Sequence, residues 1–145
     1  MSIATADERV LGYLGRGLSL ELSAVQLYTT QAKLVDNWGL VEVAGKLSAE
    51  ASEELGHAER IIGRMLALGV APNASQLRPV TLGRDLRSLL EHDYVFEKEL
   101  VSLYAGAVSH CERIGDQDNR LFFEALLSEE QAHAETLKDW LQQLQ

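Results

Sequence analysis

The octapeptide SEELGHAE, at residues 52–59, returns in nearly the same form as SEEQAHAE at residues 128–135. Six of the eight positions are identical, and the copies lie 76 residues apart (128 − 52). Both contain Glu-Glu-x-x-His, and the same shift pairs a further glutamate and a tyrosine with residues of their own type. The sequence therefore predicts a chain of two similar halves, each with its own Glu-x-x-His pair.

Around these copies, apolar residues recur at helical spacing in four blocks. Few prolines and many Ala, Leu, Glu, Arg and Gln residues favour helix over strand. We predict helices at about residues 5–36, 39–69, 83–112 and 117–144. Because 145 residues is the usual size of one domain, we expect a single all-α domain over residues 1–145.

The segments between the helices predict how they are connected. The first and last, DNWG at 36–39 and RIGDQDN at 113–119, are short, so the helices flanking each should be antiparallel neighbours. The middle one has 13 residues between Gly69 and Gly83 (83 − 69 − 1) and can extend over roughly 45 Å, the length of a helix of about 30 residues. We therefore predict a four-helix bundle in which a long crossover joins two antiparallel pairs.

Each predicted helix carries a glutamate in the middle of its apolar stripe. These residues are Glu21, Glu54, Glu97 and Glu130. Ionised carboxylates in a core are strongly disfavoured and repel one another, so something must neutralise them. Two divalent cations would balance the four charges, with the neutral imidazoles of His57 and His133 as further ligands. Oxygen donors with one nitrogen per cation suit iron or manganese better than zinc.

The spacing within each octapeptide supports a shared metal pair. Glu54 precedes His57 by three residues, so both side chains project from the same side of a helix. Glu53, four residues before His57, is also permitted by spacing alone. The apolar stripes favour Glu54 and Glu130 as ligands, which leaves Glu53 and Glu129 exposed to solvent or in contact with the ligands.

Several polar side chains near this set have two readings. Tyr28 and Tyr104 lie two helical turns beyond Glu21 and Glu97, where each is either a core tyrosine or a hydrogen-bond or electron donor to the metal site. Asp93 either orients a ligand histidine or is a capping or solvated residue.

Other residues are assigned to packing or to the surface. We expect His92 and His110 at the surface, Trp38 and Trp140 in packing roles, and Cys111 in the core. A single cysteine forms no internal disulfide, which fits a reducing compartment.

The overall charge also restricts the partners. A net charge of −9 and a pI near 4.8 argue against binding to nucleic-acid phosphates. The sequence has neither an 18-residue apolar run nor the pattern of a signal peptide. We therefore expect a cytoplasmic protein with no nucleic-acid or membrane partner.

Taken together, these motifs resemble bacterioferritin, within the ferritin-like di-iron carboxylate proteins, over nearly the whole chain. The resemblance includes the four glutamates, both Glu-x-x-His pairs, Tyr28, and NWGL at residues 37–40. It implies that Glu54 and Glu130 bridge two irons, that Glu21 and Glu97 are terminal ligands, and that each histidine binds one iron. The implied activity is that of a ferroxidase, which oxidises Fe(II) with O2 or H2O2 for iron storage or detoxification.

The chain departs from that family at two places. The methionine that holds haem in the family is replaced by Leu55, so we expect no haem. Only 12 residues follow His133 (145 − 133), where cage-forming members continue into a fifth helix, so we expect a homodimer, with a larger cage as the alternative.

Two other functions use the same ligands. A rubrerythrin-like peroxidase or oxidase would turn over H2O2 without storing mineral, and would need an external electron donor because the chain has no Cys-x-x-Cys. A helical scaffold with structural metals would bind two cations without reacting with oxygen.

Overall fold

A computed structural model describes residues 6–144 of the chain and shows four long helices and, over those residues, no strand. The helices are α1 (Glu8–Asn37), α2 (Val41–Ala67), α3 (Leu86–Ile114) and α4 (Gln117–Gln143). The expected start of the first helix at residue 5 lies outside the described residues. None of the helices within residues 6–144 has the length and apolarity needed to cross a membrane.

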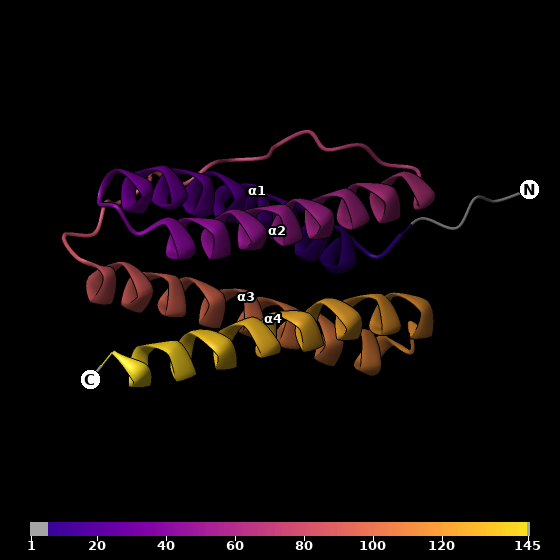
Figure 1. Cartoon of the computed structure of the whole chain (residues 1–145). Helices are drawn as coiled ribbons and strands as arrows, with labels where there is room; N and C mark the ends of the chain where they lie inside the picture. The colour runs from indigo at the N-terminus through magenta and orange to yellow at the C-terminus, as the bar shows by residue number, and fades with distance from the viewer. Residues whose placement is uncertain (1–5, 145) are drawn as a thin grey trace, which may run out of the picture.

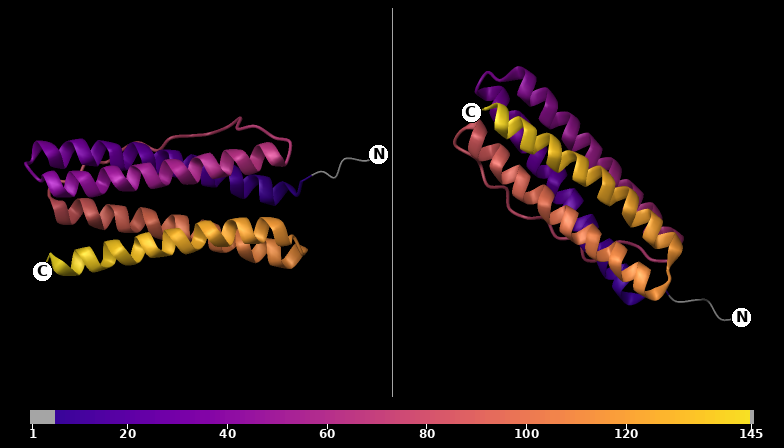
Figure 2. Two further views of the ribbon diagram at one scale, coloured as in Figure 1. Left: turned by 45° about the vertical axis from the view of Figure 1, so that its right-hand side comes forward. Right: turned by 90° about the horizontal axis from the view of Figure 1, so that it is seen from below.

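The four helices form two antiparallel pairs joined by a long crossover (Figure 1). Helices α1 and α2 make one hairpin and α3 and α4 the other, and the linker returns along the bundle, so α3 starts beside the start of α2. Two further views show the same arrangement, with all four helix axes along one direction (Figure 2). The predicted fold class and connectivity are confirmed.

Local sequence signals fix the ends of the helices. Asp7 caps α1 by accepting hydrogen bonds from the backbone N–H groups of Arg9 and Val10. Asp85 begins α3 with a capping box. Helix α2 ends at Ala67, two residues before the predicted end, because the chain turns at Gly69 with a left-handed φ of 81°.

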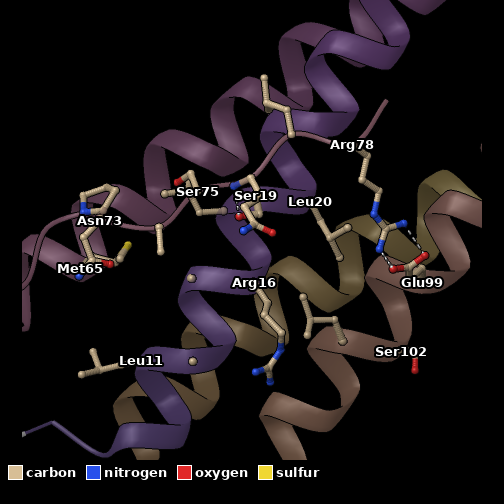
Figure 3. A pocket seen from close by; sticks show the side chains of 18 of the residues that line it. Leu11, Arg16, Ser19, Leu20, Met65, Asn73, Ser75, Arg78, Glu99 and Ser102 are labelled. Atoms are coloured by element: carbon tan, nitrogen blue, oxygen red, sulfur yellow. Dashed lines mark hydrogen bonds and ion pairs between the residues drawn. The ribbon is translucent and has the colours of Figure 1, made fainter. Parts of the chain in front are cut away.

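The linker is attached to α1 and α3 through polar side chains (Figure 3). The Gln76 N–H donates to Ser19 Oγ at 3.0 Å, and the Arg78 N–H donates to Ser23 Oγ at the same distance. The Arg78 guanidinium forms a bidentate pair with Glu99 on α3. A groove of about 880 Å³ lies beneath this segment; its one acidic side chain, Glu99, is already paired with Arg78.

The environment of His110 on α3 differs from the prediction. His110 was expected at the surface, but it is buried and its Nε2 lies 2.8 Å from Asp7 Oδ1. The prediction was wrong because it considered α3 alone, whereas the start of α1 covers this histidine and supplies a carboxylate. His92 is exposed and Cys111 is buried, both as predicted.

Candidate metal centre

Six predicted ligands come together at the middle of the bundle. Helix α1 supplies Glu21, α2 supplies Glu54 and His57, α3 supplies Glu97, and α4 supplies Glu130 and His133. All four glutamates are fully buried. Each glutamate occupies a position within the apolar stripe of its helix. Because that stripe faces the core, the glutamate side chain is buried as well.

Together with Glu50, these residues form two overlapping groups. In each group, one donor atom per residue lies within 4.8 Å of the others. The first group contains Glu21, Glu54, His57 and Glu130. The second contains Glu50, Glu54, Glu97 and His133. Glu54 belongs to both, which is the position of a bridging carboxylate. We call the groups the His57 position and the His133 position.

At the His57 position, the imidazole faces three buried carboxylates. Its Nδ1 lies 2.7 Å from Glu130 Oε1, 3.2 Å from Glu21 Oε2 and 3.3 Å from Glu54 Oε1. The side chain of His57 is only 4% exposed. The Nδ1 atom is therefore the one that points to the centre.

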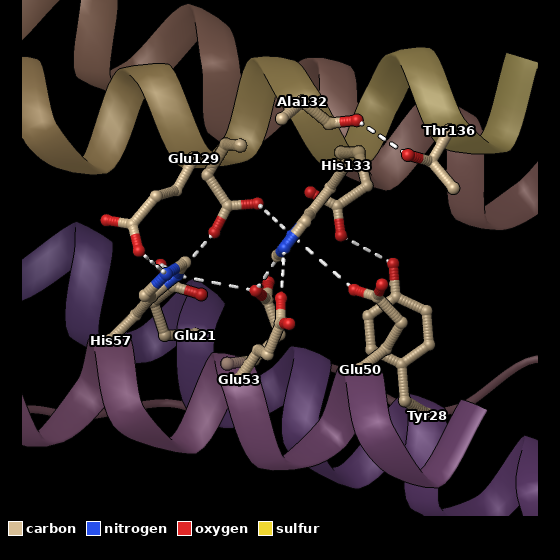
Figure 4. A network of polar contacts seen from close by, with 12 residues as sticks. Glu21, Tyr28, Glu50, Glu53, His57, Glu129, Ala132, His133 and Thr136 are labelled. Carbon is tan, nitrogen blue, oxygen red and sulfur yellow. Dashed lines mark hydrogen bonds and ion pairs between the residues drawn. The ribbon is translucent and has the colours of Figure 1, made fainter. Parts of the chain in front are cut away.

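At the His133 position, the same ring atom has a different set of neighbours (Figure 4). Nδ1 of His133 lies 3.3 Å from Glu54 Oε1 and 3.4 Å from both Glu50 Oε2 and Glu130 Oε2. The side chain is 12% exposed, so this position is nearer to solvent. The two rings stack, with their centroids 5.9 Å apart.

The outer nitrogen of each histidine meets a carboxylate from the opposite octapeptide. Nε2 of His133 is hydrogen-bonded to Glu53, and Nε2 of His57 lies 3.6 Å from Glu129. A carboxylate on Nε2 favours a proton on that atom and leaves the Nδ1 lone pair for a metal. Arg60 pairs with Glu129 at 2.7 Å. Glu53 and Glu129 thus contact the histidines and are also exposed to solvent, so both roles that the sequence left open apply.

Without a cation, burial of the ionised carboxylates at the centre is energetically unfavourable. Burial raises the pKa of Glu21 and Glu97 well above their ordinary value. Burial alone would lower the pKa of His57, but contacts with the carboxylates outweigh it and raise that pKa to about 12. By the same balance, the pKa of His133 is raised to about 11. The metal-free centre therefore holds protons where cations would otherwise neutralise the carboxylates.

The unpaired atoms of the centre test whether a metal fits it. Several buried donor atoms have no hydrogen-bond partner: Glu21 Oε1, both Glu54 oxygens, Glu97 Oε2, Glu130 Oε2 and His133 Nδ1. Buried polar atoms are almost always paired, and leaving one unpaired costs about 1–3 kcal/mol. Divalent cations would satisfy all of them, and carboxylates with one nitrogen per cation suit iron or manganese.

Two tyrosines hold the terminal glutamates. The Tyr28 hydroxyl donates to Glu97 Oε1 at 2.5 Å, and the Tyr104 hydroxyl donates to Glu21 Oε2 at 2.8 Å. Each tyrosine thus contacts the glutamate of the other half of the chain. The hydrogen-bond reading of these tyrosines agrees with this geometry.

Two acidic residues differ from the sequence analysis. Glu50, which it did not consider, joins the His133 position. The only signal was its place one turn before Glu54. Asp93 was expected to orient a histidine, to cap a helix or to be solvated. Instead, it is fully buried and accepts a hydrogen bond from Gln31 Nε2 at 2.6 Å. Burial raises its pKa to about 7.

A hollow of about 500 Å³ between α2 and α4 is lined by both histidines and by Glu53, Glu129 and Arg60, of which Arg60 is paired with Glu129. Glu53 and Glu129 stand at this opening, and both are exposed. Negative charge at an opening raises the local concentration of cations. The hollow is therefore a suitable way for a metal ion to reach the centre.

Comparisons with known proteins agree with this geometry. Residues 11–145 match the family model of the ferritin-like domain. Bacterioferritin of Rhodobacter capsulatus is 36% identical over 91% of this chain and 82% of its own length. Bacterioferritin of Mycolicibacterium paratuberculosis is 33% identical over 94% and 86%. A solved structure of the Rhodobacter capsulatus protein, described with a metal-free dinuclear site and a haem iron, superposes with a TM-score of 0.91 at 34% identity, over 96% of this chain and 87% of that one.

Proposed function

This chain belongs to the ferritin-like proteins and, within them, to the bacterioferritin family, and we propose that it is a ferroxidase that oxidises Fe(II) to Fe(III) with O2 or H2O2 in iron storage or detoxification. One observation carries the proposal: four buried glutamates and two histidines converge, and most of their inward donor atoms have no partner in the protein. Ferrous iron is the substrate that this donor set suits.

We assign the side chains roles from their contacts. Glu54, shared by both groups, and Glu130, close to both histidines, would bridge the two ions. Glu21 and Glu97, each held by a tyrosine hydroxyl, would each bind one ion. Two ferrous ions side by side supply the two electrons that, with two protons from solvent, reduce one O2 to H2O2 or one H2O2 to two waters. The carboxylates offset the added positive charge as each ion becomes ferric.

Haem does not fit the residues on the outer face of α2. Leu55 stands where the family has its haem-binding methionine. Its side chain is 44% exposed and has no metal-binding atom. Of the chain's two methionines, Met65 is buried and Met1 lies outside the described residues. We therefore propose a haem-free protein.

The same face supports self-association. Val41, Leu55 and Leu66 are exposed on α2, and their spacing places them on one stripe. Packing these side chains against a second copy of the chain would remove their apolar surface from water. We propose a homodimer through this stripe, either alone or as the unit of a larger cage.

The activity is tested by mixing the metal-free protein with two Fe(II) per chain and then with O2 or H2O2, while the absorbance of ferric products is followed. Glu54→Ala and His133→Ala should abolish rapid oxidation while far-ultraviolet circular dichroism shows that helicity is kept. Glu59→Gln, which changes an exposed residue of α2, is the matched control. Unchanged rates in both ligand variants would overturn the proposal.

Storage is tested separately from oxidation, by light scattering of the native protein before and after aerobic addition of excess Fe(II). A large particle that stays soluble as iron accumulates supports storage. A dimer that oxidises about two irons per chain and then precipitates the excess supports catalysis without storage, and turnover of H2O2 with a reductant would then favour the rubrerythrin-like alternative.

A further inference from the structure

The repeat that makes the two metal positions similar is broken at Glu50. The shift of 76 residues that relates the two octapeptides relates Glu50 to Leu126 (50 + 76). Leu126 is fully buried on α4, one turn before Glu130, as Glu50 is one turn before Glu54. One position therefore has a carboxylate where the other has a hydrocarbon.

The Glu50 carboxylate points to the centre. Glu50 projects from α2 toward His133 (Figure 4), and its Oε2 lies 3.4 Å from His133 Nδ1. That oxygen is shielded from solvent and has no hydrogen-bond partner. One carboxylate oxygen of Glu50 lies within 4.8 Å of donor atoms of Glu54 and Glu97, two fully buried glutamates that themselves have unpartnered oxygens.

The rest of Glu50 faces a separate hollow of about 430 Å³ between α2 and α4, on the Tyr28 side of the centre. Lys46 and Trp140 also line this hollow, with the Lys46 ammonium 4.9 Å from the centre of the indole ring. Among the described contacts, Glu50 forms no ion pair with Lys46, and its one ion-pair contact is with His133. The inward oxygen of Glu50 is thus left for the centre.

We propose that Glu50 is a seventh metal-binding side chain, which binds the cation at the His133 position alone and makes that position the tighter of the two. This inference rests on the proposed function, since it takes the six ligands as given. With Glu50, the carboxylates around the His133 position are Glu50, Glu54, Glu97 and Glu130, one more than the three at the His57 position.

The expected direction follows from charge and donor number. An additional carboxylate adds one negative charge and one oxygen donor, and the affinity of carboxylate sites for divalent cations rises with both. Five carboxylates also leave the centre with one negative charge in excess of two divalent cations. Binding of the first cation is therefore favoured at the position that Glu50 serves.

The test is an anaerobic titration of the metal-free full-length protein with Co²⁺, followed by calorimetry and by visible absorption, whose intensity reports the coordination number. The wild type should bind two Co²⁺ per chain with unequal affinities. Glu50→Gln should weaken the tighter step on the order of ten- to a hundredfold and change its spectrum, while the weaker step stays the same. Glu50→Asp, which keeps the charge but withdraws the oxygen by one methylene, should resemble Glu50→Gln.

Glu59→Gln, on the same helix but exposed, is the matched control and should bind as the wild type does. If Glu50→Gln binds both ions with wild-type affinities, the assignment of Glu50 is overturned and the ferroxidase proposal stands. If Glu50→Asp binds as the wild type does, Glu50 acts as a distant charge and the assignment as a ligand is overturned. A wild-type protein that binds no pair of Co²⁺ ions would overturn the proposed function as well.

Discussion

The two histidines of the centre come from almost identical octapeptides, but they lie in different surroundings. His57 is enclosed, and the Glu129 that faces its outer nitrogen is held in turn by Arg60. His133 is nearer to solvent, and the Glu53 on its outer nitrogen has no cationic partner other than that histidine among the described contacts. Glu50 then adds a carboxylate to this side only.

The two positions therefore share their donor residues but differ in the residues around them. Residues that repeat, the glutamates, histidines and tyrosines, give the two positions the same types of side chain. Residues that do not repeat, such as Glu50 and Arg60, surround the two positions unequally, and we expect them to make the two affinities for a cation differ. The following predictions alter either the shared residues or the unshared ones.

The largest effect is expected at the residue that both positions share. Glu54→Gln should remove binding at both positions, because Glu54 contributes a donor atom to both groups. Glu21→Gln and Glu97→Gln should each remove one position and leave the other, since each belongs to a single group. Anaerobic equilibrium dialysis against Co²⁺ measures the stoichiometry. A Glu54→Gln protein that still binds one ion tightly would show that the positions are independent.

Asp93 should make the stability of the metal-free protein depend on pH. Burial raises its pKa from 3.8 to about 7, so its contribution to stability is fully present below pH 3.8 and is lost as the pH rises through 7. In the metal-free protein this loss is up to about 4 kcal/mol. Asp93→Asn should therefore be more stable than the wild type at pH 8 by up to that amount, and the difference should shrink at acid pH.

Denaturant unfolding of both proteins, at about pH 5 and at about pH 8, measures this difference. Asp36→Asn, at an exposed position on α1, is the control for loss of a carboxylate as such. The residue equivalent to Asp93 in the first half is Gly17 (93 − 76), so no matching effect is expected there. Equal stability of Asp93→Asn and wild type at both pH values would contradict the prediction.

The tyrosines should act as an equivalent pair. Tyr28→Phe removes the donor to Glu97 and should weaken the His133 position about tenfold, and Tyr104→Phe removes the donor to Glu21 and should weaken the His57 position by a similar factor. Co²⁺ titration gives the affinities, and single-turnover iron oxidation gives the rates. A rate lost only in Tyr28→Phe, at unchanged affinity, would instead favour an electron-donor role.

The smallest effect is expected at the Arg60–Glu129 pair. Both side chains are partly exposed, so Arg60→Gln should cost less than about 1 kcal/mol of stability. It should nevertheless free Glu129 and accelerate release of Co²⁺ from the His57 position to a chelator by a few fold. Arg87→Gln breaks an exposed pair with Glu91 elsewhere on the surface and is the control. Equal release rates in both variants would show that Arg60 does not restrain this position.

The sequence predicts the fold because its main determinants are local. Apolar spacing places the helices, short turns pair them, and the linker is long enough to cross along the bundle. The same stripes bring the six expected ligands together, and their role as ligands remains the proposal tested above.

Glu50 could not be derived in this way, because the repeat aligns it with Leu126 and a spacing of four residues also suits a solvated side chain. His110 and Asp93 were misjudged because Asp7 and Gln31, which determine their surroundings, belong to a helix far away in the sequence.

The linker between α2 and α3 contributes no ligand to the centre, and each hairpin brings one imidazole and two of the four central glutamates. A single hairpin that paired with its own copy about a twofold axis would assemble the same six ligands. In such a pair of identical chains, every substitution appears twice, so positions 50 and 126 would have to hold the same residue. Joining the two hairpins into one gene removes that requirement, and a glutamate at one position with a leucine at the other becomes possible. The crossover thus allows each half of the centre to evolve separately.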